Sequence, residues 1–317
     1  MPILADVAAL AGVSKATASR ALGRPDLAAP ETVARVRAAA EQLGFVPNRA
    51  ATQLARGKTG VVAVVVPTLD NTFFNPIIGG AQARAAASGV QLTIAVHSLE
   101  HPAQLAAVEH LAHQVDGFLF TAPRGSDEIV RAAASYKPTV LIDREIDGMT
   151  SAVADTATAF GALVTWFTGK GHERVVYIGG PAGSWQDRQR QAAIRAAAEP
   201  SGATLTMLGP CPSTFAAGVE AAEAVVAARA TAVVPYATSI GLGLMFALLN
   251  RGVRDVVVSS ERMVVESLGL HEVPSIDVDG ERLGEVAMDQ LMDLLGERRE
   301  PAPVRRRLTV PIESAPD

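Results

Sequence analysis

The sequence contains a single cysteine, Cys211, among its 317 residues. One cysteine excludes a disulfide scaffold and a zinc site built from several thiolates. Aromatic residues make up only 4% of the chain, and no apolar run approaches the roughly 18–20 residues that a membrane helix needs. The chain begins with a capped helix start rather than a signal peptide. We therefore expect a soluble, cytoplasmic protein that does not enter a membrane.

Signatures of catalysis are also missing. No Gly-x-Ser-x-Gly elbow occurs, and Gly169–His172 lacks the spacing and the following Ser or Thr of a phosphate loop. The helix-like segment Gly241–Gly243 lacks the third glycine of a dinucleotide site. His110 and His113 are spaced to share a metal ion, but no third ligand is evident nearby, which favours a solvated helix face. We expect no catalytic residue, no metal and no cofactor.

Charge is distributed unevenly along the chain. Residues 1–58 carry eight basic and four acidic side chains, a net charge of +4, while the remaining 259 residues carry a net charge of −9. A small basic segment ahead of a large acidic body is typical of a protein whose first segment binds a polyanion. A basic segment that is merely solvated would have the same composition, so charge alone leaves both interpretations open.

The first 46 residues have the pattern of three short helices. Apolar residues at helical spacing predict a helix near Leu4–Ala11, and a glycine then interrupts it. Ser14 can cap a second helix that runs to Leu22. Pro30 suits the first turn of a third helix. Three short helices with a glycine turn between the first two are typical of a helix-turn-helix unit.

From Gly60 onwards, apolar runs alternate with alanine-rich helical patterns, which is typical of parallel sheets covered on both faces. Eight runs could form one sheet or two. The stretch around Thr150–Thr156 has no strong pattern and divides the runs nearly four and four, which favours two doubly wound α/β subdomains with a ligand cleft between them. The expected strands are Val61–Val66, Leu92–Val96, Gly117–Phe120, Thr139–Ile142, Val175–Ile178, Leu205–Leu208, Ala232–Val234 and Val256–Val258. The expected helices are Pro76–Ser88, Ala103–His113, Ala157–Thr168, Arg188–Ala198, Phe215–Ala230 and Ser239–Arg251.

Two motifs at matched spacing resemble the lac/galactose repressor family. The first, from Asp6 to Arg20, reads Asp-Val-Ala-x-x-Ala-Gly-Val-Ser-Lys-x-Thr-x-Ser-Arg. The second, from Leu43 to Leu54, reads Leu-Gly-Phe-x-Pro-Asn-x-x-Ala-x-x-Leu. Weaker matches continue across the chain at Gly171–Pro181, Arg190 and Leu283–Ala287.

The resemblance implies an all-α helix-turn-helix head over 1–46, a hinge helix over 47–58 and a periplasmic-binding-protein-like body over 60–317. Within the body we expect an N-terminal subdomain over about 60–153 and about 279–300. The C-terminal subdomain is expected over about 156–276 and about 304–312.

The start of the second helix of a helix-turn-helix unit enters the major groove. Ser14, Thr17 and Ser19 are short donors suited to phosphate oxygens. Arg20 can donate two hydrogen bonds to one guanine, or it can clamp a phosphate instead. The predicted DNA-binding residues are Ser14, Lys15, Ala16, Thr17, Ser19, Arg20, Thr32, Asn48, Ala51 and Leu54.

Several of these roles are implied by the resemblance. Lys15 and Ala16 occupy positions that the family uses to distinguish operators. The hinge, which Asn48 can cap, is too short to be a stable helix alone and in the family folds when two copies meet over the minor groove. Leu54 matches the leucine that wedges between central base pairs. The alternative is that Leu54 packs on the body.

The resemblance also implies an effector cleft in the body. Phe73 and Phe74 match positions that often stack on a ligand, and Asp143 and Arg190 match polar pocket positions. A carboxylate and a guanidinium that face one cleft suit ligand hydroxyls or a ligand carboxylate. They could also form an ion pair between the subdomains. The other expected effector contacts are Trp185, Tyr236 and Glu261.

Two segments depart from the family's pattern. Ala237-Thr238 stands where the family usually carries Asn-Asp, and Ser259-Ser260-Glu261 stands where it usually carries a Gly-Phe-Asp-type strand end. Glu261 could replace the usual carboxylate. Because a familiar monosaccharide would lose hydrogen bonds here, we expect an effector with more apolar or planar surface than a plain hexose, or no effector at all.

The sequence thus predicts a sequence-specific DNA-binding transcriptional regulator, acting as a repressor. We expect it to bind palindromic double-stranded operator DNA as a homodimer under the control of a small-molecule effector. One alternative is a solute-binding protein of the same body fold, which would need a secretion signal and no basic head. The other is a doubly wound enzyme with a DNA-binding appendage, which would need a catalytic constellation in the cleft.

Overall fold

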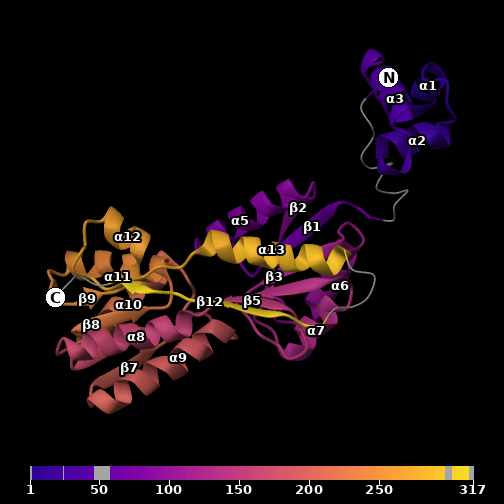
Figure 1. Cartoon of the computed structure of the whole chain (residues 1–317). Coiled ribbons are helices and arrows are strands. Elements are labelled where there is room, and N and C mark those ends of the chain that lie inside the picture. The colour runs from indigo at the N-terminus through magenta and orange to yellow at the C-terminus, as the bar shows by residue number, and fades with distance from the viewer. Residues whose placement is uncertain (1, 24, 46–57, 297–301, 314–317) are drawn as a thin grey trace. The chain divides into compact units, whose positions relative to one another are not determined.

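The computed structural model describes residues 2–23, 25–45, 58–296 and 302–313 (Figure 1). Contacts divide the chain into two units, Met1–Gly60 and Val61–Asp317. The predicted hinge over 47–58, with its expected DNA contacts Asn48, Ala51 and Leu54, lies outside the described residues apart from Lys58. No helix in the described ranges is long and apolar enough to cross a membrane.

The first unit consists of three helices around a small apolar core. The helices are α1 (Leu4–Leu10), α2 (Lys15–Gly23) and α3 (Pro30–Gln42), with a short 3₁₀ helix at Pro25–Leu27. Val7, Ala18 and Val36, one from each α-helix, are fully buried in one cluster. Ser14 caps α2 as predicted, because its Oγ accepts a hydrogen bond from the N–H of Thr17 at 3.1 Å.

The body begins with a six-stranded parallel sheet in the order β12-β5-β4-β3-β1-β2. Its strands are β1 (Val61–Val66), β2 (Gln91–Val96), β3 (Gly117–Thr121), β4 (Thr139–Ile142), β5 (Ser151–Ala154) and β12 (Arg305–Leu308). Its helices are α5 (Phe74–Ala87), α6 (Leu105–Ala112), α7 (Asp127–Ala134) and α13 (Gly280–Gly296). Val62 and Val64 pack with α5 and α13, whereas Ala63 and Val65 pack with α6 and α7. The unbroken apolar run of β1 thus reflects a strand that is buried on both faces.

The second subdomain contains a four-stranded parallel sheet in the order β7-β6-β8-β9 and a small sheet in the order β10-β11-β13. Its strands are β6 (Arg174–Ile178), β7 (Thr204–Leu208), β8 (Ala232–Pro235), β9 (Val257–Val258), β10 (Ser260–Glu261), β11 (Ser275–Ile276) and β13 (Ile312–Glu313). Its helices are α8 (Thr156–Gly169), α9 (Trp185–Ala198), α10 (Phe215–Ala227), α11 (Thr238–Asn250) and α12 (Arg262–Ser267). Val175 and Tyr177 face α8 and α9, while Val176 and Ile178 face α10 and α11.

Three segments cross between the two subdomains. They connect β5 to α8, β11 to α13, and β12 to β13. Figure 1 shows α13 returning over the first sheet beside α5, while α8 and α9 lie together on one side of the second sheet. A ligand between the subdomains would therefore lie next to these connections.

The helix pairs α5–α13 and α10–α11 approach each other closely through glycine. A Cβ atom on Gly80 of α5 or on Gly284 of α13 would overlap a backbone carbonyl oxygen of the other helix of the pair. The same holds for Gly218 of α10 and Gly243 of α11. Any side chain at these four positions would push the helices apart, so glycine sets the helix spacing on one face of each subdomain.

One local prediction was wrong, and one helix was not predicted. The stretch 151–154, expected to have no regular pattern, forms β5 and pairs with both β4 and β12. Its four residues are small and buried, so the sequence has no long apolar run that would predict the strand. Asp127–Ala134 forms α7, which the sequence pattern did not predict; Ser126 caps it by accepting a hydrogen bond from the N–H of Ile129.

The expected placement of residues 304–312 in the second subdomain also needs correction. Arg305–Leu308 forms β12, which pairs in parallel with β5 at the edge of the first sheet. Further along the segment, Ile312 pairs with β11 in the small sheet. Arg307 donates hydrogen bonds to both carboxylate oxygens of Glu145 at 2.7 Å. These partners are far away in the sequence, so the strand was not apparent from its own residues.

Candidate functional site

One side of α2 presents the residues that were predicted to distinguish bases. Lys15, Ala16, Ser19 and Arg20 are exposed, whereas Ala18 is fully buried. Lys15 and Ser19 are four residues apart, as are Ala16 and Arg20, so the four lie on neighbouring positions of two successive turns. An exposed strip of this kind at the start of a second helix suits insertion into a major groove.

The N-terminal end of α2 supplies hydroxyl groups beside this strip. Ser14 Oγ lies 2.8 Å from Thr17 Oγ1, so the two hydroxyls share a hydrogen bond in the free head. Thr32 is half-buried in the first turn of α3. Hydroxyls and backbone N–H groups at helix starts are common phosphate donors.

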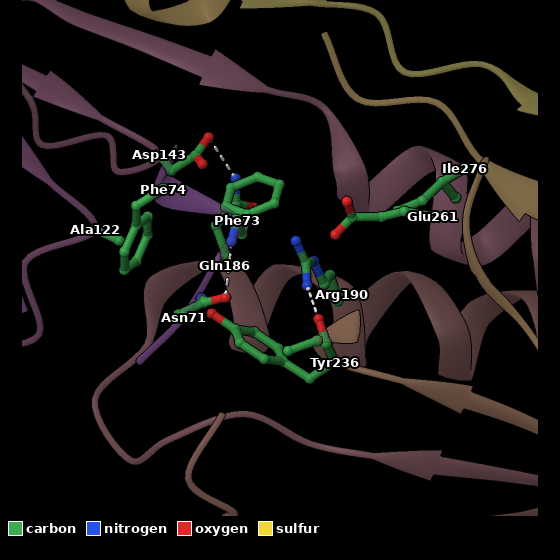
Figure 2. A pocket seen from close by; sticks show the side chains of 11 residues that line it. Asn71, Phe73, Phe74, Ala122, Asp143, Gln186, Arg190, Tyr236, Glu261 and Ile276 are labelled. Atoms are coloured by element: carbon green, nitrogen blue, oxygen red, sulfur yellow. Dashed lines mark hydrogen bonds between the residues drawn. The ribbon is translucent and has the colours of Figure 1, made fainter. Parts of the chain in front are cut away.

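The body contains a cleft at the carboxyl ends of strands from both subdomains, the usual position of a ligand in doubly wound folds. The space between its lining residues is about 420 Å³, part of which is open to solvent. Figure 2 shows its charged side chains pointing toward one space. The lining residues are Asn71, Phe73, Phe74, Ala122, Asp143, Gln186, Arg190, Tyr236, Ala237, Glu261 and Ile276.

Asp143 directly follows β4 and is only 2% exposed. Its backbone has φ +54°, in the left-handed region that Asp and Asn tolerate better than most residues. Its Oδ1 accepts hydrogen bonds from the Ala154 N–H and from Gln186 Nε2, both at 3.0 Å. Burial raises the pKa of the Asp143 carboxyl to about 6, although these hydrogen bonds and the charge of Arg190 oppose the rise.

Arg190 is held on several sides. Its Nε donates to Thr156 Oγ1 at 2.9 Å, and its Nη1 donates to the carbonyl oxygen of Tyr236 at 2.8 Å. The guanidinium lies over two aromatic rings, with its Cζ 4.3 Å from the centroid of Phe160 and 4.7 Å from that of Tyr236. The alternative considered from the sequence, an ion pair between Arg190 and Asp143, does not form among the described residues. Arg190 is thus held by Nε, Nη1 and the two rings, while no hydrogen bond of its Nη2 occurs among the described residues.

The Tyr236 ring depends on a glycine. A Cβ atom on Gly180 would lie 2.6 Å from ring carbons of Tyr236, so no larger residue fits beneath the ring. The ring's hydroxyl lies 3.0 Å from Ser184 Oγ, which also caps α9. The segments that follow β6 and β8 therefore fix the aromatic side of the cleft together.

Glu261 occupies the far side of the cleft from Asp143. It accepts a hydrogen bond from Thr238 Oγ1 at 2.7 Å. Burial raises the pKa of its carboxyl, against the opposing effects of Thr238 and Arg190. The two segments that depart from the family's pattern thus contact each other. Figure 2 shows the Glu261 carboxylate directed toward Arg190.

Two phenylalanines form the apolar wall on the side of the first subdomain. Phe73 is half-buried, whereas Phe74 is 6% exposed and belongs mainly to the core. Their rings pack edge to face with centroids 6.2 Å apart. Asn71 Oδ1 accepts a hydrogen bond from the N–H of Phe73 at 3.2 Å. Phe73 consequently offers more ring surface to a ligand than Phe74.

Six of the seven residues predicted for the effector line the cleft, and Trp185 is not among them. Sequence reasoning selected Trp185 because it is aromatic and close to Arg190, but it missed Gln186. Gln186 precedes Arg190 by four residues on α9, so helix geometry places both side chains on one face. The other lining residues that were not predicted from the sequence are Asn71, Ala122, Ala237 and Ile276.

The histidine pair weighed above as a metal site lies on α6 and at its C-terminal cap. His110 and His113 are both exposed. Across the described residues, no group of three or more His, Cys, Asp or Glu side chains is arranged to hold a metal ion.

Comparison with known families matches both units. Residues 3–48 match the family described as bacterial regulatory proteins, lacI family. Residues 59–313 match the family described as periplasmic binding proteins and sugar binding domain of LacI family.

Among curated relatives, the maltose regulon regulatory protein MalI of Escherichia coli K12 is 30% identical over 264 residues, covering 78% of this chain and 75% of MalI. The transcriptional repressor CytR of the same strain is 30% identical over 181 residues, covering 56% of this chain and 53% of CytR.

Solved structures share the fold. A lac repressor dimer bound to operator and the anti-inducer ONPF has a TM-score of 0.83 at 22% identity, covering 98% of this chain and 97% of that chain. A complex of the transcriptional regulator CelR with cellobiose has a TM-score of 0.71 at 24% identity, covering 99% of this chain and 98% of that chain.

Together these matches define a DNA-binding transcriptional regulator with a helix-turn-helix head and an effector-binding body of the periplasmic-binding-protein type. The chain belongs to the LacI family. Membership confirms the predicted fold class and regulatory function, and it sets aside both the enzyme and the free solute-binding protein.

Proposed function

We propose that this regulator senses a small molecule between Asp143, Arg190 and Glu261, and that the molecule changes how a homodimer presents two heads to a palindromic operator. The observation that carries the proposal is the convergence of these three charged groups, of which Asp143 and Arg190 are buried and Glu261 is partly buried, in one cleft. Binding there shifts the arrangement of the subdomains only if the effector binds one arrangement more tightly than the other.

On the DNA side, Arg20 is proposed to read a guanine, with Lys15 and Ala16 beside it, while Ser14 and Thr17 bind phosphates. These assignments are supported by the exposed strip of side chains on α2 and by the hydroxyl groups at the start of that helix. Ser19 and Thr32 are proposed as further contacts to the DNA backbone. Asn48, Ala51 and Leu54 are assigned to a hinge over 47–58 at the minor groove. A protein that binds chromosomal operators acts in the bacterial cytoplasm.

The proposed effector has a polar edge and an apolar or planar face. Asp143 keeps Oδ2 and Glu261 keeps one carboxylate oxygen as acceptors, while Arg190 keeps Nη2 as a donor. Phe73 and Tyr236 contribute aromatic surface to the same cleft. Hydroxyl groups suit the carboxylates, and a ring face suits the aromatic side chains.

A thermal-shift panel of free sugars, phosphosugars, nucleosides and aromatic acids tests this effector class. We expect the hits to carry a ring or alkyl group beyond a plain hexose, and to change the affinity for a selected operator. Asp143→Asn and Arg190→Ala should each abolish the shift. Arg188→Ala is the matched control, because Arg188 lies on the same helix but is exposed and bonds to the carbonyl oxygen of Gly183.

Two outcomes would refute parts of the proposal. Tight, Arg190-dependent binding of an unmodified hexose would remove the requirement for an apolar face. No shift with any member of the panel would indicate that the cleft has lost its ligand, and the effector role would be withdrawn.

A second copy of this chain is proposed to cover two apolar surfaces. Phe215, Phe246 and Leu249, on α10 and α11, are each about half exposed, and the two phenylalanine rings lie 5.8 Å apart. Ile94 and Val96 are also about half exposed on β2, an edge strand of the first sheet. Such patches usually mark interaction surfaces, and a two-fold symmetric operator requires a two-fold symmetric protein.

Sedimentation velocity of the full chain at micromolar concentration tests the dimer. We expect Phe246→Glu and Ile94→Glu to weaken it. Val304→Glu is the control, since Val304 is also exposed but precedes β12 at the opposite edge of the sheet from β2. A monomer with unchanged operator affinity, or equal effects of all three substitutions, would contradict the proposed interface.

A further inference from the structure

Gln186 is a buried amide that bonds across the two subdomains. It is 4% exposed, and its Nε2 donates to Asp143 Oδ1 at 3.0 Å and to the carbonyl oxygen of Ala154 at 3.2 Å. The N–H of Ala154 donates to the same Asp143 oxygen. Gln186 lies on α9 of the second subdomain, while Asp143 directly follows β4 and Ala154 ends β5, both in the first. Figure 2 shows the bond between Gln186 and Asp143 at the edge of the cleft.

The same amide continues the hydrogen-bond chain toward Arg190. Gln186 Oε1 accepts from Thr156 Oγ1 at 3.3 Å, and Thr156 Oγ1 accepts from Arg190 Nε at 2.9 Å. Asp143, Gln186, Thr156 and Arg190 are all at least 95% buried. A continuous buried network therefore joins Asp143 and Arg190, two of the three charged groups on which the proposed function relies.

The network is centred on the first connection between the subdomains. β5 ends at Ala154 and α8 begins at Thr156, so Asp155 is the single residue between the two elements. Both peptide polar groups of Ala154 are held, its N–H by Asp143 and its carbonyl oxygen by Gln186. Rotation of one subdomain relative to the other would have to break bonds to this amide.

We propose that Gln186 is a positioning residue that couples the effector cleft to the subdomain connection at Ala154–Thr156. It bonds to Oδ1 of Asp143 and leaves Oδ2 for the cleft. A ligand that bonds to Asp143 or Arg190 therefore also affects the connection at Ala154–Thr156. The inference rests on the proposed function for the ligand contacts of Asp143 and Arg190. The coupling itself rests on hydrogen bonds that exist without a ligand.

Only an amide satisfies this position. Its Nε2 faces two acceptors and its Oε1 faces a donor, whereas an ionised carboxylate could serve only the donor. In Gln186→Glu at high pH, two carboxylates would meet about 3 Å apart and repel. At low pH one of the two is protonated and can donate again. The charge that acts on the Asp143 carboxyl is that of Arg190 on α9. Glu261 on β10 lies across the cleft, where Arg190 also acts on it, and Asp155 accepts from its own first turn.

Hydrogen–deuterium exchange of the intact chain, without DNA or ligand, tests the coupling. We expect Gln186→Met, which keeps the side-chain volume, to raise exchange of peptides spanning residues 153–158 by about tenfold or more, as expected for lost buried hydrogen bonds. Gln186→Glu should behave like Gln186→Met at pH 8 and like the parent chain at pH 5.5, with each variant compared with the parent at the same pH.

Gln290→Met is the matched control. Gln290 is buried on α13 and donates to the carbonyl oxygens of Ser151 and Val304, both in the first subdomain. Its loss should leave exchange at residues 153–158 unchanged. The proposal is overturned if Gln186→Met leaves this segment protected, or if Gln186→Glu shows the same protection at both pH values. Neither result depends on whether the cleft binds an effector.

Discussion

Replacing Asp143 with asparagine should stabilise the protein at neutral pH while removing its response to effector. The carboxyl of Asp143 is buried, and its pKa rises from the ordinary value of 3.8 to about 6. Each unit of pKa corresponds to about 1.4 kcal/mol, so ionised Asp143 costs the folded state on the order of 3 kcal/mol. The side-chain oxygen that Asp143→Asn retains can keep both hydrogen bonds, since the N–H of Ala154 and Gln186 Nε2 bond to the same oxygen of Asp143.

The sign and pH range follow from proton binding. Between about pH 4 and pH 6 the folded state holds a proton on Asp143 that the unfolded state has released, so stability falls as pH rises through this window. Below the window both states are protonated, and the substitution should confer little advantage. Above it, the advantage of Asp143→Asn should approach about 3 kcal/mol.

Urea unfolding of the parent chain and Asp143→Asn at a series of pH values measures this difference directly, because other titrating groups cancel between the two proteins. The reasoning fails if the variant is less stable than the parent at pH 7.5. It also fails if the difference in the free energy of unfolding is independent of pH.

Two further predictions concern helix packing and base recognition. Gly80→Ala should destabilise the body by about 1–3 kcal/mol through overpacking against α13. The neighbouring substitution Gly79→Ala should instead stabilise it by about 0.5–1 kcal/mol, because Gly79 is exposed with open space around it. Equal effects of the two substitutions on urea unfolding would refute the close approach of the helices. Arg20→Ala should relax base preference at one symmetric operator position, at a cost of about 1–3 kcal/mol per half-site; uniform weakening on all sequences in a selection assay would instead identify Arg20 as a phosphate contact.

The central strands of both sheets were predictable because burial on both faces leaves an unbroken apolar run, as in β1. β12 was not predictable, because it is an exposed edge strand with three consecutive arginines. Their acidic partners lie more than 150 residues earlier in the sequence. β5 was missed for a related reason, since small residues become a strand only through pairing with β4 and β12. Long-range pairing overrides local preference in both cases.

The cleft was partly predictable, because Asp143 directly follows a strand and Glu261 ends one, and the carboxyl ends of strands converge in this type of fold. Trp185 was predicted to line the cleft because of its aromatic side chain, but Gln186 lines it instead. The helical repeat accounts for this, because Gln186 and not Trp185 lies on the same face of α9 as Arg190. The contacts of Arg190 on α9 with the ring of Phe160 on α8 and with the ring of Tyr236, after β8, bring together three separate segments. Spacing along the chain carries no signal for such an arrangement.

The most direct measurement for the account is selection of randomised duplex DNA by the full chain, repeated with Arg20→Ala and with each effector found in the thermal-shift panel. We expect enrichment of a two-fold symmetric site, loss of preference at one symmetric position in the variant, and an effector-dependent change in affinity that Asp143→Asn abolishes. Enrichment of no site, or of an asymmetric site bound by a single head, would contradict it.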